Sequence, residues 1–229
     1  MKNLNSRTND VELSKNHKEF KTLIQIENDL SIGLCSETAL DAALRLVLDA
    51  TCQIPEIDCG GVYLLNKETG GLDLIVHRGL GDDFIRETSH YDADSPNTGI
   101  VMRGTPVYGL YEEIEQMQNV ACIKENLRVL AVIPLLNRKT IIGSLNAASH
   151  ENDSLSESTK NILQTIASCA GSAIARIQAE YELEKYRTQL EKLVKHRTQA
   201  LEEMNKRLKR EISEHEKTEN ALRESEERY

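Results

Sequence analysis

The sequence has no excess of positive charge and no long apolar run. Its 229 residues include 28 basic and 37 acidic side chains, a formal net charge of −9. A protein that neutralises phosphates usually carries a basic surface, so this balance argues against a nucleic-acid partner. The longest apolar run, Val129–Leu136, is far shorter than the ~20 residues of a membrane-spanning helix. Residues 1–18 are polar and lack the apolar segment of a signal peptide. We therefore expect a cytoplasmic protein without a membrane span.

Large aromatic residues and paired cysteines are also scarce. There is no tryptophan, and seven tyrosines stand against two phenylalanines. The five cysteines are an odd number without a CxxC pair: Cys35, Cys52, Cys59, Cys122 and Cys169. This pattern indicates neither a disulfide framework nor a cysteine-based zinc site. We expect reduced, buried thiols and no bound metal.

Glycine and proline are absent from the C-terminal part of the chain. All 12 glycines and all four prolines precede residue 172. Residues 177–229 hold 12 basic and 13 acidic side chains, so this stretch is nearly neutral. The rest of the chain holds 16 basic and 24 acidic side chains and carries most of the negative charge. With 39% hydrophobic residues the chain has enough apolar side chains for a packed core, which argues against wholesale disorder. A globular part and a physically different C-terminal stretch are therefore expected.

Apolar residues at helical spacing predict two helices before the first strand. The first covers residues 18–34. The second is expected after Ser36, a potential N-cap, because apolar residues from Leu40 to Leu48 form the stripe of a helix with one buried face.

Alternating apolar residues predict the strands of a sheet. The expected strands are 58–65, 72–77, 107–110, 128–136 and 140–149. Short turns join the first two strands and the last two strands into hairpins. Between the hairpins, short helices are expected at residues 79–85 and 112–118.

The last predicted element is one long helix. Ser154 and Glu157 have the spacing of a capping box, and a helix from Ser156 to Ser225 would be ~105 Å long at 1.5 Å per residue. Its apolar first part can pack on the domain, but the charged remainder cannot, which favours a two-stranded coiled coil. The expected dimerisation residues are Leu183, Leu190, Val194, Leu201, Met204, Leu208, Ile212 and Leu222. Arg197, Glu211 and His215 interrupt this seam, and the interruptions favour an adjustable register.

Five runs, taken in their order along the chain, resemble the GAF domain family. They are Asp58–Leu65, His77–Phe84, Gly104–Tyr108, Val132–Leu135 and Ile142–Ala147. The resemblance covers about residues 20–178. It implies an α+β fold in which a six-stranded antiparallel sheet carries helices on both faces. The expected organisation is a polar tail at 1–15, a GAF sensory domain at 16–178 and a signalling helix at 179–229.

The C-terminal stretch resembles the signalling helices of sensor histidine kinases and related multidomain sensors. The runs that carry this resemblance are Leu190–Thr198 and Glu219–Tyr229, whose ending is similar to the start of a PAS domain. The resemblance implies a homodimer and a downstream PAS or kinase output module. We expect either a piece of a multidomain sensor or a stand-alone input module.

The GAF resemblance also implies a ligand pocket between the sheet and the short helices of residues 81–117. The candidate lining residues are Cys59, Tyr63, Ile75, His77, Phe84, His90, Tyr91, Val101, Tyr108, Val132 and Leu145. No cofactor is required. A haem iron would need a histidine or cysteine ligand, and Cys59, His77 and His90 are the candidates.

Several special functions of related proteins lack their residues in this chain. His196 resembles a histidine-kinase phosphoacceptor, but Arg197 stands where the kinase motif has an acidic residue. The Asn-Lys-Phe-Asp-Glu cluster of cyclic-nucleotide-binding members and the bilin-attachment signals are both missing. A GAF-type methionine sulfoxide reductase would need clustered cysteines such as Cys59 and Cys122.

The sequence therefore predicts a non-enzymatic sensory module of a two-component-type protein. It would sense a small ligand or a redox state in the pocket and pass the signal along a dimeric helix. Two alternatives remain open at this stage, a structural dimerisation module with an empty pocket and the sulfoxide reductase.

Overall fold

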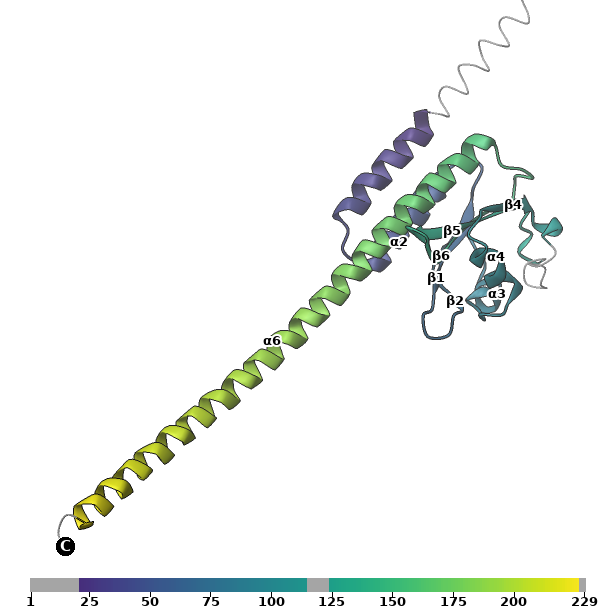
Figure 1. Ribbon diagram of the computed structural model, residues 1–229. Coiled ribbons are helices and arrows are strands. Elements are labelled where there is room, and N and C mark those ends of the chain that lie inside the picture. The colour runs from purple at the N-terminus through teal and green to yellow at the C-terminus, as the bar shows by residue number, and fades with distance from the viewer. Residues whose placement is uncertain (1–20, 115–123, 227–229) are drawn as a thin grey trace, which may run out of the picture. The chain divides into compact units, whose positions relative to one another are not determined.

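The computed structural model of the protein describes residues 21–114 and 124–226, without the side chains at 221, 222 and 224–226 (Figure 1). The chain divides into two compact units, Met1–Gln178 and Ala179–Tyr229. No helix in the described ranges is both long enough and apolar enough to cross a bilayer.

The first unit contains a six-stranded sheet in which every pairing is antiparallel. Its strands are β1 (Cys59–Leu65), β2 (Leu72–Arg78), β3 (His90–Tyr91), β4 (Val107–Leu110), β5 (Val129–Asn137) and β6 (Thr140–Ser149). The order across the sheet is β3-β2-β1-β6-β5-β4. The two predicted hairpins thus lie side by side, with β1 against β6 at the centre. The α+β fold class predicted from the sequence is confirmed.

Two helices precede the sheet, at residues 21–36 and at α2 (Leu40–Thr51). Their boundary differs from the expected one, because Ser36 ends the first helix rather than capping the second. The Ser36 hydroxyl donates to the carbonyl of Gly33, whereas a carboxylate oxygen of Glu37 accepts from the N–H groups of Thr38 and Ala39. Glu37 is therefore the residue that satisfies the free amides before α2.

The helix α6 (Glu157–Glu226) belongs to the first unit through Gln178. Ser156 caps it by accepting from the N–H of Thr159, two positions later than the Ser154 cap expected from the sequence. Apolar residues at helical spacing are buried between Ile162 and Ile177, where they pack with α2 and the sheet. Gly171 allows this close packing, since a Cβ there would overlap the backbone of Leu136.

α2 and this part of α6 cover one face of the sheet, and the helix 21–36 joins them in the larger apolar core. Arg176 of α6 donates to the carbonyls of Leu34 and Glu37, so it caps the C-terminal end of the helix 21–36. This bond fixes the first helix against α6.

The other face of the sheet carries shorter elements (Figure 1). A second apolar cluster lies between them and the sheet. These elements are α3 (Asp82–Thr88), α4 (Pro96–Met102) and a 3₁₀ turn at Tyr111–Glu113. Ser95 caps α4 by accepting from the N–H of Thr98, and Pro96 occupies the first helical position. Of the helix expected at 112–118, only the 3₁₀ turn falls in the described residues.

Candidate functional site

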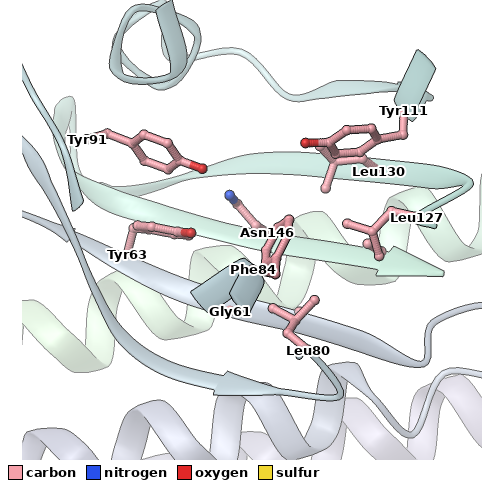
Figure 2. A pocket seen from close by; sticks show the side chains of 11 residues that line it. Gly61, Tyr63, Leu80, Phe84, Tyr91, Tyr111, Leu127, Leu130 and Asn146 are labelled. Carbon is pink, nitrogen blue, oxygen red and sulfur yellow. The ribbon is translucent and has the colours of Figure 1, made fainter. Parts of the chain in front are cut away.

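A pocket lies between the sheet and the short elements of its second face (Figure 2). Its empty volume is about 440 Å³ when the part open to solvent is included. The lining residues come from β1, β3, β5, β6, α3 and the loops between them. They are Gly60, Gly61, Tyr63, Leu80, Phe84, Tyr91, Tyr111, Leu127, Leu130, Asn146 and Ala148.

Two glycines of the central strand β1, Gly60 and Gly61, line the pocket. A Cβ at Gly61 would lie 2.7 Å from the Leu74 Cδ1 atom, so a larger residue there would force the Leu74 side chain to move. The wall is aromatic. The Tyr63 hydroxyl donates to the Thr88 carbonyl at 2.9 Å, and the Tyr63 and Tyr91 rings lie 5.4 Å apart between centroids. These contacts hold the aromatic wall in place before any ligand arrives.

The pocket contains a polar atom that lacks a hydrogen bond. Asn146 Oδ1 is buried, and no donor in the described part of the chain reaches it. Figure 2 shows the Asn146 side chain among the rings of Tyr63, Tyr91 and Phe84. None of the lining residues carries a formal charge at neutral pH. The aromatic lining therefore suits a flat, uncharged molecule, whereas a buried ligand charge would find no counter-charge in the lining.

Three of the predicted lining residues line this pocket, namely Tyr63, Phe84 and Tyr91. Cys59, Val101 and Val132 are buried in the same apolar cluster but do not line the cavity.

The other five predicted residues lie outside the pocket, and the position of Ile75 is explained by an irregularity in its strand. The pairing of β1 with β2 shifts register between Val62 and Tyr63, so that Ile75 is an extra residue in β2. Such a bulge reverses the faces of the strand beyond it. Ile75 is 41% exposed as a result, and its placement in the pocket was wrong.

Leu145 and Tyr108 lie on the helical face of the sheet. Leu145 is part of the larger core, while its neighbour Asn146 faces the pocket. Tyr108 packs against the same core, and the Lys160 ammonium lies 5.6 Å from its ring centroid. A one-residue error in strand face moves a side chain to the opposite side of a sheet. Both residues are therefore removed from the candidate site.

The two histidine candidates are exposed at the sheet surface. His90 Nδ1 lies 2.6 Å from Asp73 Oδ1, and this hydrogen bond raises the pKa of His90 and lowers the pKa of Asp73. His77 does not line the pocket. The structure does not bring Cys59, His77 and His90 together, so these three residues offer no joint set of haem ligands.

Sequence reasoning missed most of the pocket outside β1 and α3. Asn146, Leu130 and Ala148 belong to predicted strands, and the register of β6 would have identified them. Leu80, Tyr111 and Leu127 lie in loops or turns, where no periodic pattern indicates the buried side.

A second group of polar side chains lies at the end of the strand pair β1–β6. Asp58, Cys59 and His150 offer an oxygen, a sulfur and a nitrogen atom that all lie within 4.8 Å of one another. Asp58 accepts from the Ser149 hydroxyl, the His150 backbone N–H and the Cys59 thiol. Burial acts to raise the pKa of Asp58, but the bonds from Ser149 and His150 outweigh it and lower that pKa. Burial, followed by the bond to Asp58, raises the pKa of the Cys59 thiol.

The second unit presents apolar side chains along α6. Seven of the predicted dimerisation residues are 47–70% exposed in the single chain, and they are Leu183, Leu190, Val194, Leu201, Met204, Leu208 and Ile212. Leu222 is helical, but its side chain lies outside the described residues.

Comparison with solved structures identifies the same fold in several proteins. The GAF domain of a phosphoenolpyruvate-protein phosphotransferase from Coxiella burnetii has a TM-score of 0.63 and 16% identity, over 71% of this chain and 98% of that chain. A domain of a two-component sensor histidine kinase protein from Sinorhizobium meliloti 1021 has a TM-score of 0.55 and 20% identity, over 65% and 99%. Free methionine-R-sulfoxide reductase from Neisseria meningitidis has a TM-score of 0.55 and 19% identity, over 69% and 89%.

At these identities the similarity establishes a common fold. It leaves the activity open, because the similar structures include both a sensor-kinase domain and an enzyme. No curated protein matches the chain. The family model described as GAF domain matches residues 37–175, which is more than half of the sequence. The match contains the six-stranded sheet, both of its faces and the pocket residues. The chain belongs to the GAF domain family.

Proposed function

We propose that this chain is a non-enzymatic, cytoplasmic sensory module that binds a compact, uncharged ligand in the pocket and signals as a homodimer through α6. The output would be a downstream PAS or kinase module. The observation that carries the proposal is the aromatic, charge-free lining of the pocket, in which Asn146 provides an amide group.

The chemistry of the lining defines the ligand class. Aromatic side chains favour a flat ring. The Asn146 amide presents its nitrogen between the rings in Figure 2, and a half-turn of the amide would present Oδ1, so it favours a ring with a hydrogen-bonding N–H or O–H group. An uncharged heterocycle or phenol meets both requirements.

The strand β6 offers a path from the pocket to the helix. Asn146 faces the pocket, whereas Leu145 and Ala147 face the core in which Ile166 and Ala170 of α6 are buried. A ligand that moves Asn146 therefore acts on a strand whose other face packs against α6. Since α6 continues through the second unit as one helix, a change in its packing can reach a helix pair.

The exposed apolar side chains of residues 181–212 support the homodimer. Isolated exposed leucines are common, but a row of them along one charged helix needs a partner surface. A second copy of the same helix offers a matching row. The free thiols of Cys35, Cys52, Cys59 and Cys169 support a reducing, cytoplasmic location.

Ligand binding is tested by thermal unfolding of the full chain with indole, adenine, uracil and phenol, each paired with its donor-methylated analogue. We expect one parent compound to raise the melting temperature and its methylated analogue to bind about tenfold or more weakly, because the methyl group removes the donor. The Asn146→Leu variant should lose the difference between the two. No shift with any compound would favour the structural module with an empty pocket. Methionine sulfoxide turnover that is lost in Cys59→Ser would instead favour the reductase.

Dimerisation is tested by sedimentation equilibrium of the full chain. Leu190→Lys with Leu201→Lys should weaken the dimer at least tenfold, because both charges enter the apolar row. The matched control is Thr188→Lys with Gln199→Lys, which adds the same charges at exposed positions. Thr188 lies roughly 200° around the helix from Leu190, and Gln199 lies roughly 200° from Leu201, so both control charges face away from the apolar row. Wild-type monomers at micromolar concentration, or equal effects of the two double variants, would contradict the proposed interface.

A further inference from the structure

The cluster at the end of the β1–β6 pair combines three kinds of metal ligand. It offers a carboxylate from Asp58, a thiol from Cys59 and an imidazole from His150, with their ligand atoms within 4.8 Å. The pocket argument above uses none of these groups. We propose that Asp58, Cys59 and His150 form a binding site for a divalent transition-metal ion of the zinc type.

The sheet holds the three residues in place. Cys59 is the first residue of β1 and pairs with Ala148 of β6, Asp58 directly precedes β1, and His150 directly follows β6. The Asp58 N–H also donates to the Ala148 carbonyl at 3.2 Å. Because backbone pairing already joins the two strand ends, ion binding has little chain entropy to overcome.

The separations suit a tetrahedral ion after small side-chain rotations. Bond lengths of about 2.0–2.3 Å to zinc place two ligand atoms roughly 3.3–3.8 Å apart. Asp58 Oδ1 and His150 Nδ1 are now 2.6 Å apart and would separate, while the sulfur would approach them. The carboxylate can turn because its other oxygen, Oδ2, stays bonded to the Ser149 hydroxyl at 2.7 Å and the His150 N–H at 2.9 Å.

A second carboxylate is placed to orient the imidazole. Glu125 Oε1 lies 3.8 Å from His150 Nε2 and accepts from the Gly81 N–H at 2.6 Å. A histidine that ligates a metal through one nitrogen usually donates its other N–H to such an oxygen. With Nδ1 on the ion, His150 Nε2–H therefore points to Glu125, and this carboxylate is a positioning residue.

The charges also balance. Ion binding displaces the Cys59 thiol proton to solvent, since the thiolate is the ligand form. The Asp58 carboxylate and the Cys59 thiolate then carry two negative charges against two positive charges on the ion, while His150 is neutral. This neutrality offsets the cost of a buried thiolate at a residue that is 0% exposed. Three protein ligands leave a fourth position for water or an external ligand.

The absence of a CxxC pair argues against cysteine-rich zinc sites, but it has no bearing on a site with one thiolate. The ligands Cys59 and His150 stand 91 positions apart, so the sequence has no spacing pattern to reveal them.

The test is a titration of the chelator-treated full chain with Co²⁺, followed by Zn²⁺. We expect one Co²⁺ per chain with a thiolate-to-metal charge-transfer absorption, and Zn²⁺ should remove this absorption by displacing the Co²⁺. Cys59→Ser should abolish the absorption, whereas Cys35→Ser, which changes an exposed thiol outside the cluster, should leave it intact.

Two further variants separate ligation from folding. His150→Gln should weaken Co²⁺ binding by about 100-fold or more, and Glu125→Gln by about 10–100-fold with the charge-transfer absorption retained. Circular dichroism without metal establishes whether each variant folds. If Cys59→Ser does not fold, the binding of Co²⁺ by His150→Gln decides whether the cluster is a metal site. Lack of saturable binding, or equal binding by wild type and His150→Gln, overturns the proposal. Either result leaves the ligand test of the aromatic pocket unaffected.

Discussion

Replacing Asn146 by leucine should stabilise the ligand-free protein while abolishing its response to ligand. In the absence of ligand, burying the unpaired Oδ1 costs about 1–3 kcal/mol, and leucine has a similar branched shape without a polar atom. For a unit of 178 residues, each kcal/mol shifts the melting temperature by about 2–4 °C. The expected rise is therefore roughly 2–12 °C. Differential scanning calorimetry of both proteins, with and without the best compound, measures it.

A control within the same strand is Ser144→Ala. Ser144 Oγ is also buried without a partner among the described residues, but Ser144 does not line the pocket. This variant should be neutral or stabilising and should keep the ligand response. The reasoning is refuted if Asn146→Leu melts more than about 2 °C below wild type, because Oδ1 must then have a hydrogen-bond partner in the folded protein.

Two further predictions concern packing and charge. Gly171→Ala should lower stability by about 1–3 kcal/mol because its Cβ overlaps the Leu136 backbone, whereas Gly99→Ala, where an added Cβ contacts nothing, should raise it by about 0.5–1 kcal/mol. Urea unfolding measures both, and equal effects would contradict the close packing of α6. His90 should titrate above 6.5 in an NMR pH titration and return toward 6.5 in Asp73→Asn. The small contribution of the protonated His90 to stability is present below pH 6.5 and is lost as the pH rises through the raised pKa. A His90 pKa that is the same in wild type and Asp73→Asn would rule out the pairing of His90 with Asp73.

Most of the fold could be predicted from the sequence because its signals are local. The alternation in 58–65 and 140–149 and the helical stripe of Leu40–Leu48 each depend on neighbours within a few positions, and the structure places strands and a helix there. Helix starts were less certain, because several nearby hydroxyl or carboxylate side chains can cap the same turn. Ser156, rather than Ser154, caps α6.

The candidate site was less predictable because it depends on contacts between distant segments. The bulge that exposes Ile75 arises from the pairing of β1 with β2, and the choice between Leu145 and Asn146 depends on the face of β6. Leu145 was the predicted lining residue, whereas its neighbour Asn146 lines the pocket. Likewise, Asp58 and His150 meet only because β1 and β6 are neighbours at the centre of the sheet.

Native mass spectrometry of the full chain, purified from its own source, tests the proposed function most directly. It reports the number of chains and any bound small molecule in one spectrum. The account predicts twice the chain mass and one small, non-covalent organic adduct per chain, with this adduct lost and the dimer retained in Asn146→Leu. A monomer without an organic adduct would contradict both parts of the account, and an organic adduct that persists in Asn146→Leu would contradict the proposed pocket.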